Sequence, residues 1–316
     1  RRCPFVLMAR NGLANRIRTM LGFVYILKNI PGGCSMEIQV HWPVTEACPG
    51  LYLDLFEQIP NVKFVGLGLL KVLQRQKNAQ ICKAKRSMES RGENQGKTVV
   101  QGMTNEEYDR NYKPIYGDIG ELVVLNGQKS LKSIVKTYGP RSMKMQVDSK
   151  DLVQLYSLIR PIKSLRKKIV EFARKHDIHS AYGLHIRRTD HIRAAASATG
   201  GFTTDSQFRD WMNEVIKKDP SAIFFLATDN AGTQEKFCNL YEHRVVLFKK
   251  IEKNVSKLYT ATRHTSLEHA VVDLYLLSLC EKRFGSARSS FSVMAERLAP
   301  SFRAYYTRCM NTGSID

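Results

Sequence analysis

Several features that assign many proteins to a familiar class are missing from this sequence of 316 residues. No run of about 18 apolar residues occurs and no segment resembles a signal peptide, so we expect that the chain neither spans a membrane nor carries its own secretion signal. The seven cysteines are scattered, without a Cys-x-x-Cys pair or a short Cys/His spacing. A metal site built from them is therefore not expected.

The cysteines also give information on the cellular compartment in which the protein occurs. Their odd number, and apolar neighbours such as Leu279 beside Cys280, fit buried free thiols better than a disulfide framework. This pattern favours a reducing compartment such as the cytoplasm. The lumen of the Golgi or the ER is the alternative, for a chain that is a piece of an anchored protein.

Acidic residues are few compared with basic ones. The sequence has 49 Lys and Arg against 29 Asp and Glu, a net charge of +20, which implies attraction to polyanions such as nucleic acid, membrane surfaces or phosphorylated substrates. Part of the excess lies in the segment 160–175, RPIKSLRKKIVEFARK, where apolar residues recur at helical spacing. A solvated basic helix face is one interpretation of this segment, and a membrane or nucleic-acid surface is the other.

The first half of the chain alternates strand and helix patterns. We expect strands at 4–9, 36–42, 61–67 and 121–127, and helices at 13–28 and 51–59. A polar, Lys-rich stretch at about 71–113 is interpreted as an insertion. A helical region at 149–176 is interrupted by Pro161, and we place the domain boundary there, with domains at 1–150 and 151–316.

The second half is a clearer α/β pattern. Four apolar strand candidates, at 181–186, 222–228, 243–248 and 282–287, are separated by amphipathic helical stretches. Thr204 precedes one predicted helix, and Thr265 begins a capping box before another if it is the N-cap. The sequence therefore predicts two Rossmann-like domains that face each other across a cleft.

Polar residues gather where the predicted strands of the second domain end. His185, Arg187, Arg188 and Asp190 follow the first of these strands, Asp229 follows the second, and a serine-rich turn follows the last. Ligands of open α/β sheets bind beyond the carboxyl ends of the strands. An arginine fork opposite the start of a helix is suited to phosphate oxygens, so the pattern predicts a diphosphate site.

These segments resemble motifs of the GDP-fucose-dependent fucosyltransferases, which comprise α1,2-, α1,6- and protein O-fucosyltransferases with the GT-B fold. HIRRTD is similar to the first motif of that superfamily, FLATDN to its second and VVDLYLLSLCEKRFGSARSSFS to its third, in the same order. Near the N-terminus, ARNGLANRIRTMLGFVYIL resembles the family's loop before the first helix. The resemblance implies an inverting, metal-independent glycosyltransferase that moves L-fucose from GDP-fucose to a glycan acceptor, with the donor in the second domain and the acceptor mainly against the first.

The resemblance also implies roles for single residues. Arg187 would hold the β-phosphate of GDP and stabilise charge on the leaving diphosphate, and His185 would lie beside the guanosine or the reacting bond. Asp273 would accept hydrogen bonds from guanine N1–H and N2–H₂, with a carboxylate that caps a neighbouring loop as the alternative. Donors to the phosphates would come from Ser289, Ser290 and Phe291.

Other positions carry two interpretations. Asp229 is a donor-binding candidate, yet Asp-Asn before a helix is also an ordinary N-cap. In the N-terminal loop, Asn15 is a catalytic candidate and Gly12 a donor-binding one, and turn formation explains both equally. Arg188 and Asp190 form a structural pair in one interpretation, and Asp190 is a catalytic candidate in the other.

The catalytic base is not assigned by the motifs. Some α1,6-type relatives place a glutamate after the first motif, but here no acid follows before Asp205. Asp190, Glu46 and Asp54 remain as candidates, and the leaving diphosphate is the alternative proton acceptor. His41 and Trp42 are interpreted either as lining the acceptor side or as packing.

The sequence also lacks a metal-binding motif, and two other functions remain as alternatives. No Asp-x-Asp occurs, so we expect no metal and no cofactor other than the GDP-sugar substrate itself, with arginine and a helix dipole in place of the cation. A transferase for another GDP-linked sugar is one alternative. A basic nucleic-acid-binding α/β protein is the other, although no recognition motif supports it, and association with a membrane surface through basic faces stays possible on charge alone.

Overall fold

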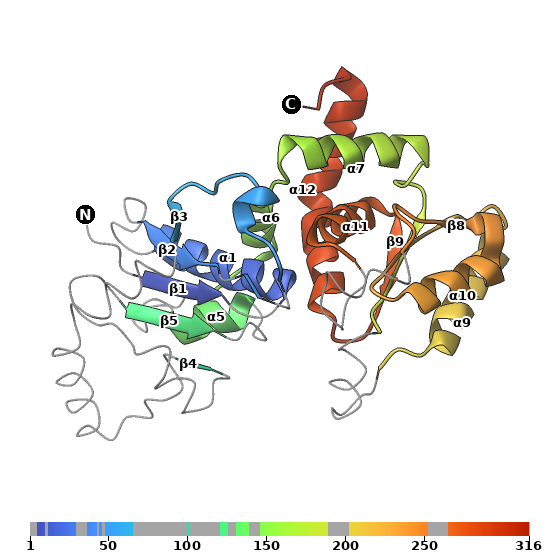
Figure 1. Cartoon of the computed structure of the whole chain (residues 1–316). Coiled ribbons are helices and arrows are strands. Elements are labelled where there is room, and N and C mark those ends of the chain that lie inside the picture. Colours follow the sequence, from blue (N-terminus) through green and yellow to red (C-terminus); the bar gives the residue numbers. More distant parts are fainter. Residues whose placement is uncertain are drawn as a thin grey trace. The chain divides into compact units, whose positions relative to one another are not determined.

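The computed structural model describes residues 5–9, 12–29, 37–42, 44–45, 48–65, 100–101, 121–125, 131–138, 146–188, 202–251 and 265–315. Two compact units are present (Figure 1). The first comprises Arg1–Leu53 and Gln58–Leu158, and the second comprises Asp54–Glu57 and Ile159–Asp316. The units thus meet after Leu158, eight residues beyond the boundary expected at position 150.

The first unit is built on a parallel sheet with the strand order β3-β2-β1-β5-β4. The strands are β1 (Phe5–Ala9), β2 (Ile38–His41), β3 (Val62–Val65), β4 (Val100–Gln101) and β5 (Glu121–Leu125). The helices are α1 (Leu13–Asn29), α5 (Leu131–Tyr138) and α6 (Ser149–Ser157). The strands expected at 4–9, 36–42, 61–67 and 121–127 are thereby confirmed, whereas β4 lies inside the segment that was interpreted as an insertion.

The helix expected at 51–59 is wrong. Only the short 3₁₀ helix η2 (Tyr52–Asp54) forms there. The reason is a competing long-range contact, because Leu55 O accepts from Ile162 N at 3.0 Å and Glu57 N donates to Arg160 O at 2.8 Å. These backbone groups are consumed by pairing with a distant segment and are not available to close helical turns.

The second unit holds a parallel sheet with the order β8-β7-β6-β9. Its strands are β6 (Tyr182–Ile186), β7 (Phe224–Thr228), β8 (Val245–Val246) and β9 (Lys282–Gly285). Its helices are α7 (Lys163–Lys175), α9 (Asp205–Lys218), α10 (Ala231–Tyr241), α11 (Leu267–Leu279) and α12 (Ser290–Thr312), and the 3₁₀ helix η3 (Glu242–Arg244) precedes β8. This is the α/β alternation that the sequence predicts for the second half.

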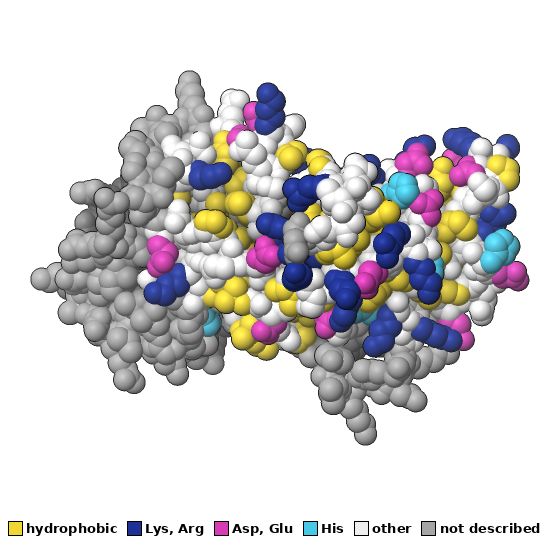
Figure 2. Space-filling view, turned by 90° about the horizontal axis from the view of Figure 1, so that it is seen from above, with side chains coloured by type: hydrophobic (Ala, Val, Ile, Leu, Met, Phe, Trp, Pro, Cys, Tyr) yellow, Lys and Arg dark blue, Asp and Glu magenta, His cyan; other side chains and the backbone are white. Residues whose placement is uncertain are grey.

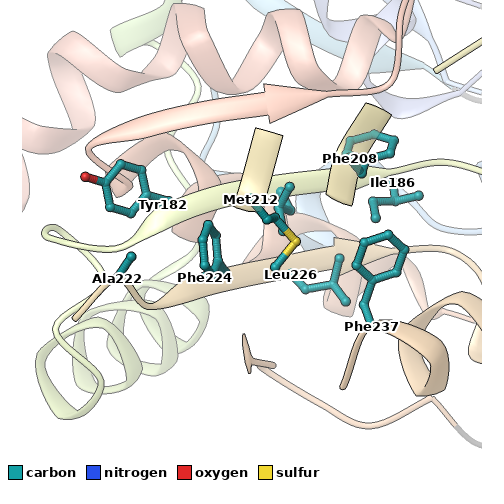
Figure 3. Close-up of a cluster of buried hydrophobic side chains, with 9 residues drawn as sticks. Tyr182, Ile186, Phe208, Met212, Ala222, Phe224, Leu226 and Phe237 are labelled. Carbon is teal, nitrogen blue, oxygen red and sulfur yellow. The ribbon is translucent and has the colours of Figure 1, made fainter. Parts of the chain in front are cut away.

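Strand alternation in this sheet separates the core from the site. Tyr182, Leu184 and Ile186 of β6 point to the face that α9 and α10 cover. There they pack with a cluster of buried side chains that includes Phe208, Met212, Phe224, Leu226 and Phe237 (Figure 3). The intervening residues of β6 point to the opposite face, toward α11 and α12. His185 is one of them.

Local signals fix where several helices begin. Thr204, which the sequence places before this helix, is the N-cap of α9, and it forms a capping box with Gln207. The expected capping box at Thr265 is wrong, because Ser266 is the N-cap of α11 and its side chain accepts from His269 N at 3.1 Å. The helical region at 149–176 divides into α6 and α7 around Pro161, as expected.

Several basic residues in and next to the helix α7 form ion pairs. Lys167 pairs with Glu171, Lys168 with Glu268, and Arg160, just before the helix, with Glu57. Figure 2 shows Lys and Arg side chains interspersed with Asp and Glu over the second unit. Such exposed pairs contribute little stability, but each of them places an acidic side chain next to a basic side chain of this segment. Among the described residues, no helix combines the length and the apolar character needed to cross a membrane.

The aromatic cluster between β6, β7 and α9 supports a stability prediction. Phe224 is fully buried in it, so Phe224→Ala is expected to lower the free energy of unfolding by about 3–5 kcal/mol through lost burial and a cavity. Leu240→Ala, at a side chain that is 50% exposed, is the control and is expected to change stability by less than about 0.5 kcal/mol. Denaturant unfolding measures both, and equal losses would contradict the assigned core.

Candidate functional site

The site is built where β6 and β9 end and α12 begins. His185, the fourth residue of β6, is buried, and its Nδ1 lies 2.8 Å from Ser292 Oγ. The imidazole ring is also stacked on Phe291, with the ring centroids 4.7 Å apart and the planes 28° from parallel. Two residues of the first turn of α12 thus hold the ring that the family resemblance implies beside the guanosine or the reacting bond.

A glycine permits this close approach. A Cβ on Gly285, the last residue of β9, would lie 2.2 Å from Ser292 Oγ and 2.7 Å from Ser292 Cβ. The chain then turns through Ser286, whose carbonyl accepts from Ser289 N at 3.1 Å, and through Arg288 at φ 59°. The left-handed conformation of Arg288 is uncommon for a residue with a side chain, and it closes the turn that starts α12.

The backbone after His185 is anchored by side chains from both neighbouring strand ends. Arg187 N donates to Ser286 Oγ at 2.9 Å, and Arg188 N donates to Asp229 Oδ1 at 2.8 Å. Asp229 is therefore engaged with the arginine pair, and the N-cap of α10 is the next residue, Asn230, whose Oδ1 accepts from Thr233 N at 2.8 Å. Two successive N–H groups held in this way set the direction in which the Arg187 side chain leaves the backbone.

The second arginine of the motif, Arg188, is held by its side chain as well as by its backbone. The Arg188 guanidinium donates to Thr203 O at 3.0 Å, pairs with Asp205 and lies over the Phe208 ring, 5.6 Å from its centroid. Burial alone would raise the pKa of Asp205, but hydrogen bonds from Lys236 and Arg188 outweigh burial and hold that pKa below its usual value. Arg188 therefore links the strand end to the start of α9, and its carboxylate partner is Asp205.

Thr203 connects this corner to the turn before α12. Its hydroxyl accepts from Ala287 N at 2.8 Å, while its carbonyl accepts from Arg188. Sequence reasoning did not single out Ser286 or Thr203. Both are small hydroxyl residues in loops, and nothing local distinguishes them from other serines and threonines of the chain.

The N-terminus of α12 is suited to an anion. Ser289 is the N-cap residue and is only 2% exposed, yet its side chain makes no cap hydrogen bond. Its Oγ has no hydrogen-bond partner among the described residues. A buried hydroxyl without a partner costs about 1–3 kcal/mol. Together with the N–H groups of Ser290 and Phe291 at the positive end of a 23-residue helix, it forms a set of donors without a described acceptor.

Asp273 is buried on α11. Its Oδ2 lies 3.4 Å from His269 Nε2, and its Oδ1 has no hydrogen-bond partner among the described residues. Burial raises the pKa of Asp273, and the contact with His269 opposes that rise. Sequence reasoning missed His269, although the i, i+4 spacing on a helix was the signal that could have found it. In the described part of the chain, no contact joins Asp273 to His185 or Arg187.

The candidates of the first unit lie at the start of α1. Asn15 Oδ1 accepts from the Arg18 guanidinium at 2.7 Å, and the Gly12 carbonyl accepts from Asn15 N at 3.0 Å. Arg16, fully buried, donates to Thr45 Oγ1 at 2.6 Å and lies over the Trp42 ring, 5.3 Å from its centroid. The positions of Gly12 and Asn15 are thus compatible with turn formation and with ligand binding alike.

The remaining candidates divide into packed, exposed and undescribed residues. Trp42 is buried, donates to Gly50 O at 3.2 Å and contacts the Tyr52 ring edge-on, which is a packing role. Asp54 is exposed at the end of η2. Asp190 and Glu46 lie outside the described residues. Over the described ranges, no group of three or more His, Cys, Asp and Glu side chains is placed to hold a metal ion.

The close contact at Gly285 supports a second prediction. Gly285→Ala is expected to push Ser292 and the first turn of α12 away from His185, with a loss of about 1–3 kcal/mol in unfolding free energy. Gly232→Ala in α10 is the matched control, because its new Cβ would meet only Asn230 Oδ1 at an ordinary 3.4 Å. Thermal and denaturant unfolding compare the two variants. Equal stability of both variants would show that Gly285 is not required for this packing.

Comparison with known proteins rests on structure. No protein-family model matches the sequence, and no curated protein matches it either. Fucosyltransferase NodZ from Bradyrhizobium superposes with a TM-score of 0.55 at 15% sequence identity, over 95% of each chain. NodZ α-1,6-fucosyltransferase soaked with GDP-fucose gives 0.52 at 15% identity, over 95% of this chain and 94% of that one.

A plant protein gives a similar result. A mutant of Arabidopsis thaliana FUT1 in complex with GDP superposes with a TM-score of 0.50 at 13% identity, over 94% of this chain and 68% of that one. At such identities the likeness shows the fold alone. It agrees with the resemblance that the sequence motifs indicate, and the predicted α/β class is confirmed: the chain has the GT-B fold of these fucosyltransferases over nearly its whole length.

Proposed function

We propose that this chain is an inverting, metal-independent glycosyltransferase that transfers L-fucose from GDP-fucose to a glycan acceptor. The observation that carries the proposal is the convergence at the end of β6 of His185, the anchored Arg187 backbone and the N-terminus of α12, where the Ser289 hydroxyl has no hydrogen-bond partner among the described residues. The structural likeness to NodZ, which was soaked with GDP-fucose, supports the choice of donor.

In this proposal the diphosphate lies between Arg187 and α12. The guanidinium presents a planar pair of donors to two phosphate oxygens, and Ser289 with the first N–H groups of α12 donates from the other side. As the bond between fucose C1 and the β-phosphate oxygen breaks, negative charge grows on the diphosphate. Donors already in place stabilise that charge and take over the task that a divalent cation performs in other transferases.

We propose that Asp273 selects guanine over the other nucleobases. An ionised carboxylate accepts from guanine N1–H and N2–H₂, and the unpartnered Oδ1 is the acceptor that such a ligand would satisfy. Adenine and uracil do not present this pair of donors to a carboxylate. Asp229 contributes by accepting from Arg188 N, and we propose a catalytic role for Asn15 and a donor-binding role for Gly12.

The experiment that tests the function is a transfer reaction with GDP-fucose and a panel of glycan acceptors. The expected product carries an α-linked fucose, because the donor is β-linked and the displacement inverts the anomeric carbon. NMR of the anomeric proton reads the linkage. A β-linked product would overturn inversion, and transfer from another GDP-sugar but not from GDP-fucose would overturn the choice of sugar.

Nucleotide selectivity gives a third prediction. Calorimetry is expected to show GDP binding at least roughly tenfold more tightly than ADP or UDP, because a wrong base leaves the buried carboxylate of Asp273 unsatisfied. EDTA is expected to leave the GDP affinity unchanged. Equal binding of the three nucleotides, or a requirement for Mg²⁺, would contradict the proposal.

The arginine pair gives a fourth prediction. Arg187→Lys is expected to lower turnover roughly a hundredfold, about 3 kcal/mol, because an ammonium group cannot reproduce the two-oxygen fork. Arg188→Lys is the matched control. It is expected to retain more activity and to lose more stability, since it weakens the contacts with Asp205 and Phe208. Steady-state kinetics and unfolding on both variants check this, and reversed effects on activity would refute the assignment.

A further inference from the structure

We infer that Ser292 holds His185 in the neutral tautomer that carries its proton on Nε2, so that His185 acts as a hydrogen-bond donor and not as a base. The inference starts from the 2.8 Å contact between Ser292 Oγ and His185 Nδ1. Which of these two atoms donates decides which ring nitrogen is protonated, and the neighbouring groups determine the answer.

The ring has a fixed position. Phe291 stacks on its face, Ser292 contacts its Nδ1 edge, and the missing side chain of Gly285 lets the first turn of α12 come close enough for both contacts. His185 is buried, with 8% of its surface exposed. Exchange of the two nitrogens by a ring flip would break the Ser292 contact, so the orientation seen here is the one that the surrounding residues stabilise.

The hydroxyl proton of Ser292 points to the ring. Two other serines within helices of this unit donate to a backbone carbonyl three residues earlier: Ser278 Oγ to Tyr275 O at 2.7 Å, and Ser301 Oγ to Leu298 O at 3.1 Å. Ser292 makes no such bond among the described residues, and His185 Nδ1 is its hydrogen-bond partner there. A hydroxyl proton needs an acceptor, and unprotonated Nδ1 is the acceptor that the site provides.

The helix end favours the same assignment. Ser292 is the third residue of α12, so Nδ1 faces a turn whose N–H groups give that end of the helix a positive partial charge. A lone pair directed at this end is stabilised, whereas an N–H directed at it is repelled. The neutral ring then carries its proton on Nε2.

The consequence for chemistry is specific, and it rests on the proposed function. A ring with a proton on Nε2 donates to an acceptor atom of the nucleotide, such as a phosphate, ribose or carbonyl oxygen. The same ring has no lone pair on Nε2 with which to take a proton from the acceptor hydroxyl. Ser292 is then a positioning residue that acts through His185.

The tautomer is measurable without any ligand. Protein labelled with ¹⁵N in its histidines is examined by long-range ¹H–¹⁵N NMR at alkaline pH, where imidazoles are neutral, and the signals that disappear in His185→Gln identify His185. We expect an unprotonated Nδ1 and a protonated Nε2. A protonated Nδ1 in the wild-type protein would overturn the inference.

Three variants test the role of the hydroxyl. Ser292→Ala is expected to bring the His185 signals toward a mixture of both tautomers, and Ser292→Thr, which restores a hydroxyl, is expected to return them to the wild-type pattern. Ser301→Ala is the matched control on the same helix and should leave them unchanged, because its hydroxyl bonds only Leu298 O. An unchanged tautomer in folded Ser292→Ala would overturn the role of Ser292. If Ser292→Ala does not fold, the wild-type and Ser292→Thr spectra still decide the tautomer.

Binding separates this inference from the proposed function. GDP affinity is expected to fall about two- to tenfold in Ser292→Ala, as for one misaligned hydrogen bond, and to recover in Ser292→Thr. Wild-type protein that shows the expected tautomer but does not bind GDP would refute the proposed function and leave the tautomer assignment intact. Wild-type protein that binds GDP but carries a protonated Nδ1 would refute the tautomer assignment and leave the proposed function intact.

Discussion

The second unit depends on the approach of α12 to the end of β6. Gly285 has no side chain in the space that Ser292 occupies, and this allows a helix to start directly against a buried strand residue, His185. Several polar groups then converge: an imidazole, the backbone of an arginine and the first N–H groups of a helix. Groups held in this way need little reorganisation when they meet a charged ligand.

The two arginines show how a single motif divides its tasks. Their backbone N–H groups are anchored by Ser286 and Asp229, which come from the strand ends on either side of β6. The Arg188 side chain is consumed by Asp205, Thr203 and the Phe208 ring, so it belongs to the structure of the corner. Because Arg188 is held in place, the backbone position from which the Arg187 side chain extends is also fixed. A pair of adjacent arginines is therefore one structural residue and one candidate ligand-binding residue.

Two polar atoms of this unit are buried without a partner among the described residues, Ser289 Oγ and Asp273 Oδ1. Burial of such an atom without a protein partner costs free energy. A ligand that accepts from Ser289 and donates to Asp273, as proposed, would supply the missing partners. In Asp273, the contact with His269 satisfies Oδ2 and fixes the orientation of the carboxylate, and therefore also the direction in which Oδ1 points.

The sequence alone determined the alternation of strands and helices, because apolar runs and helical periodicity are local properties of the chain. It also predicted a ligand site at His185, Arg187 and the serine-rich start of α12, because strand ends in α/β sheets collect ligand-binding groups. It failed at 51–59, where pairing with residues near Pro161 overrode a helical pattern. It included Ser286 and Ser292 in the serine-rich stretch without assigning a role to either, and it missed Thr203, since a serine or threonine acquires a role only from the partner it meets. His185 and Ser292 are separated by 107 positions in the chain, and Arg187 and Ser286 by 99. Only the parallel order of β7, β6 and β9 brings these residues together, because that order is set by long-range packing of whole strands and helices and not by any short stretch of sequence.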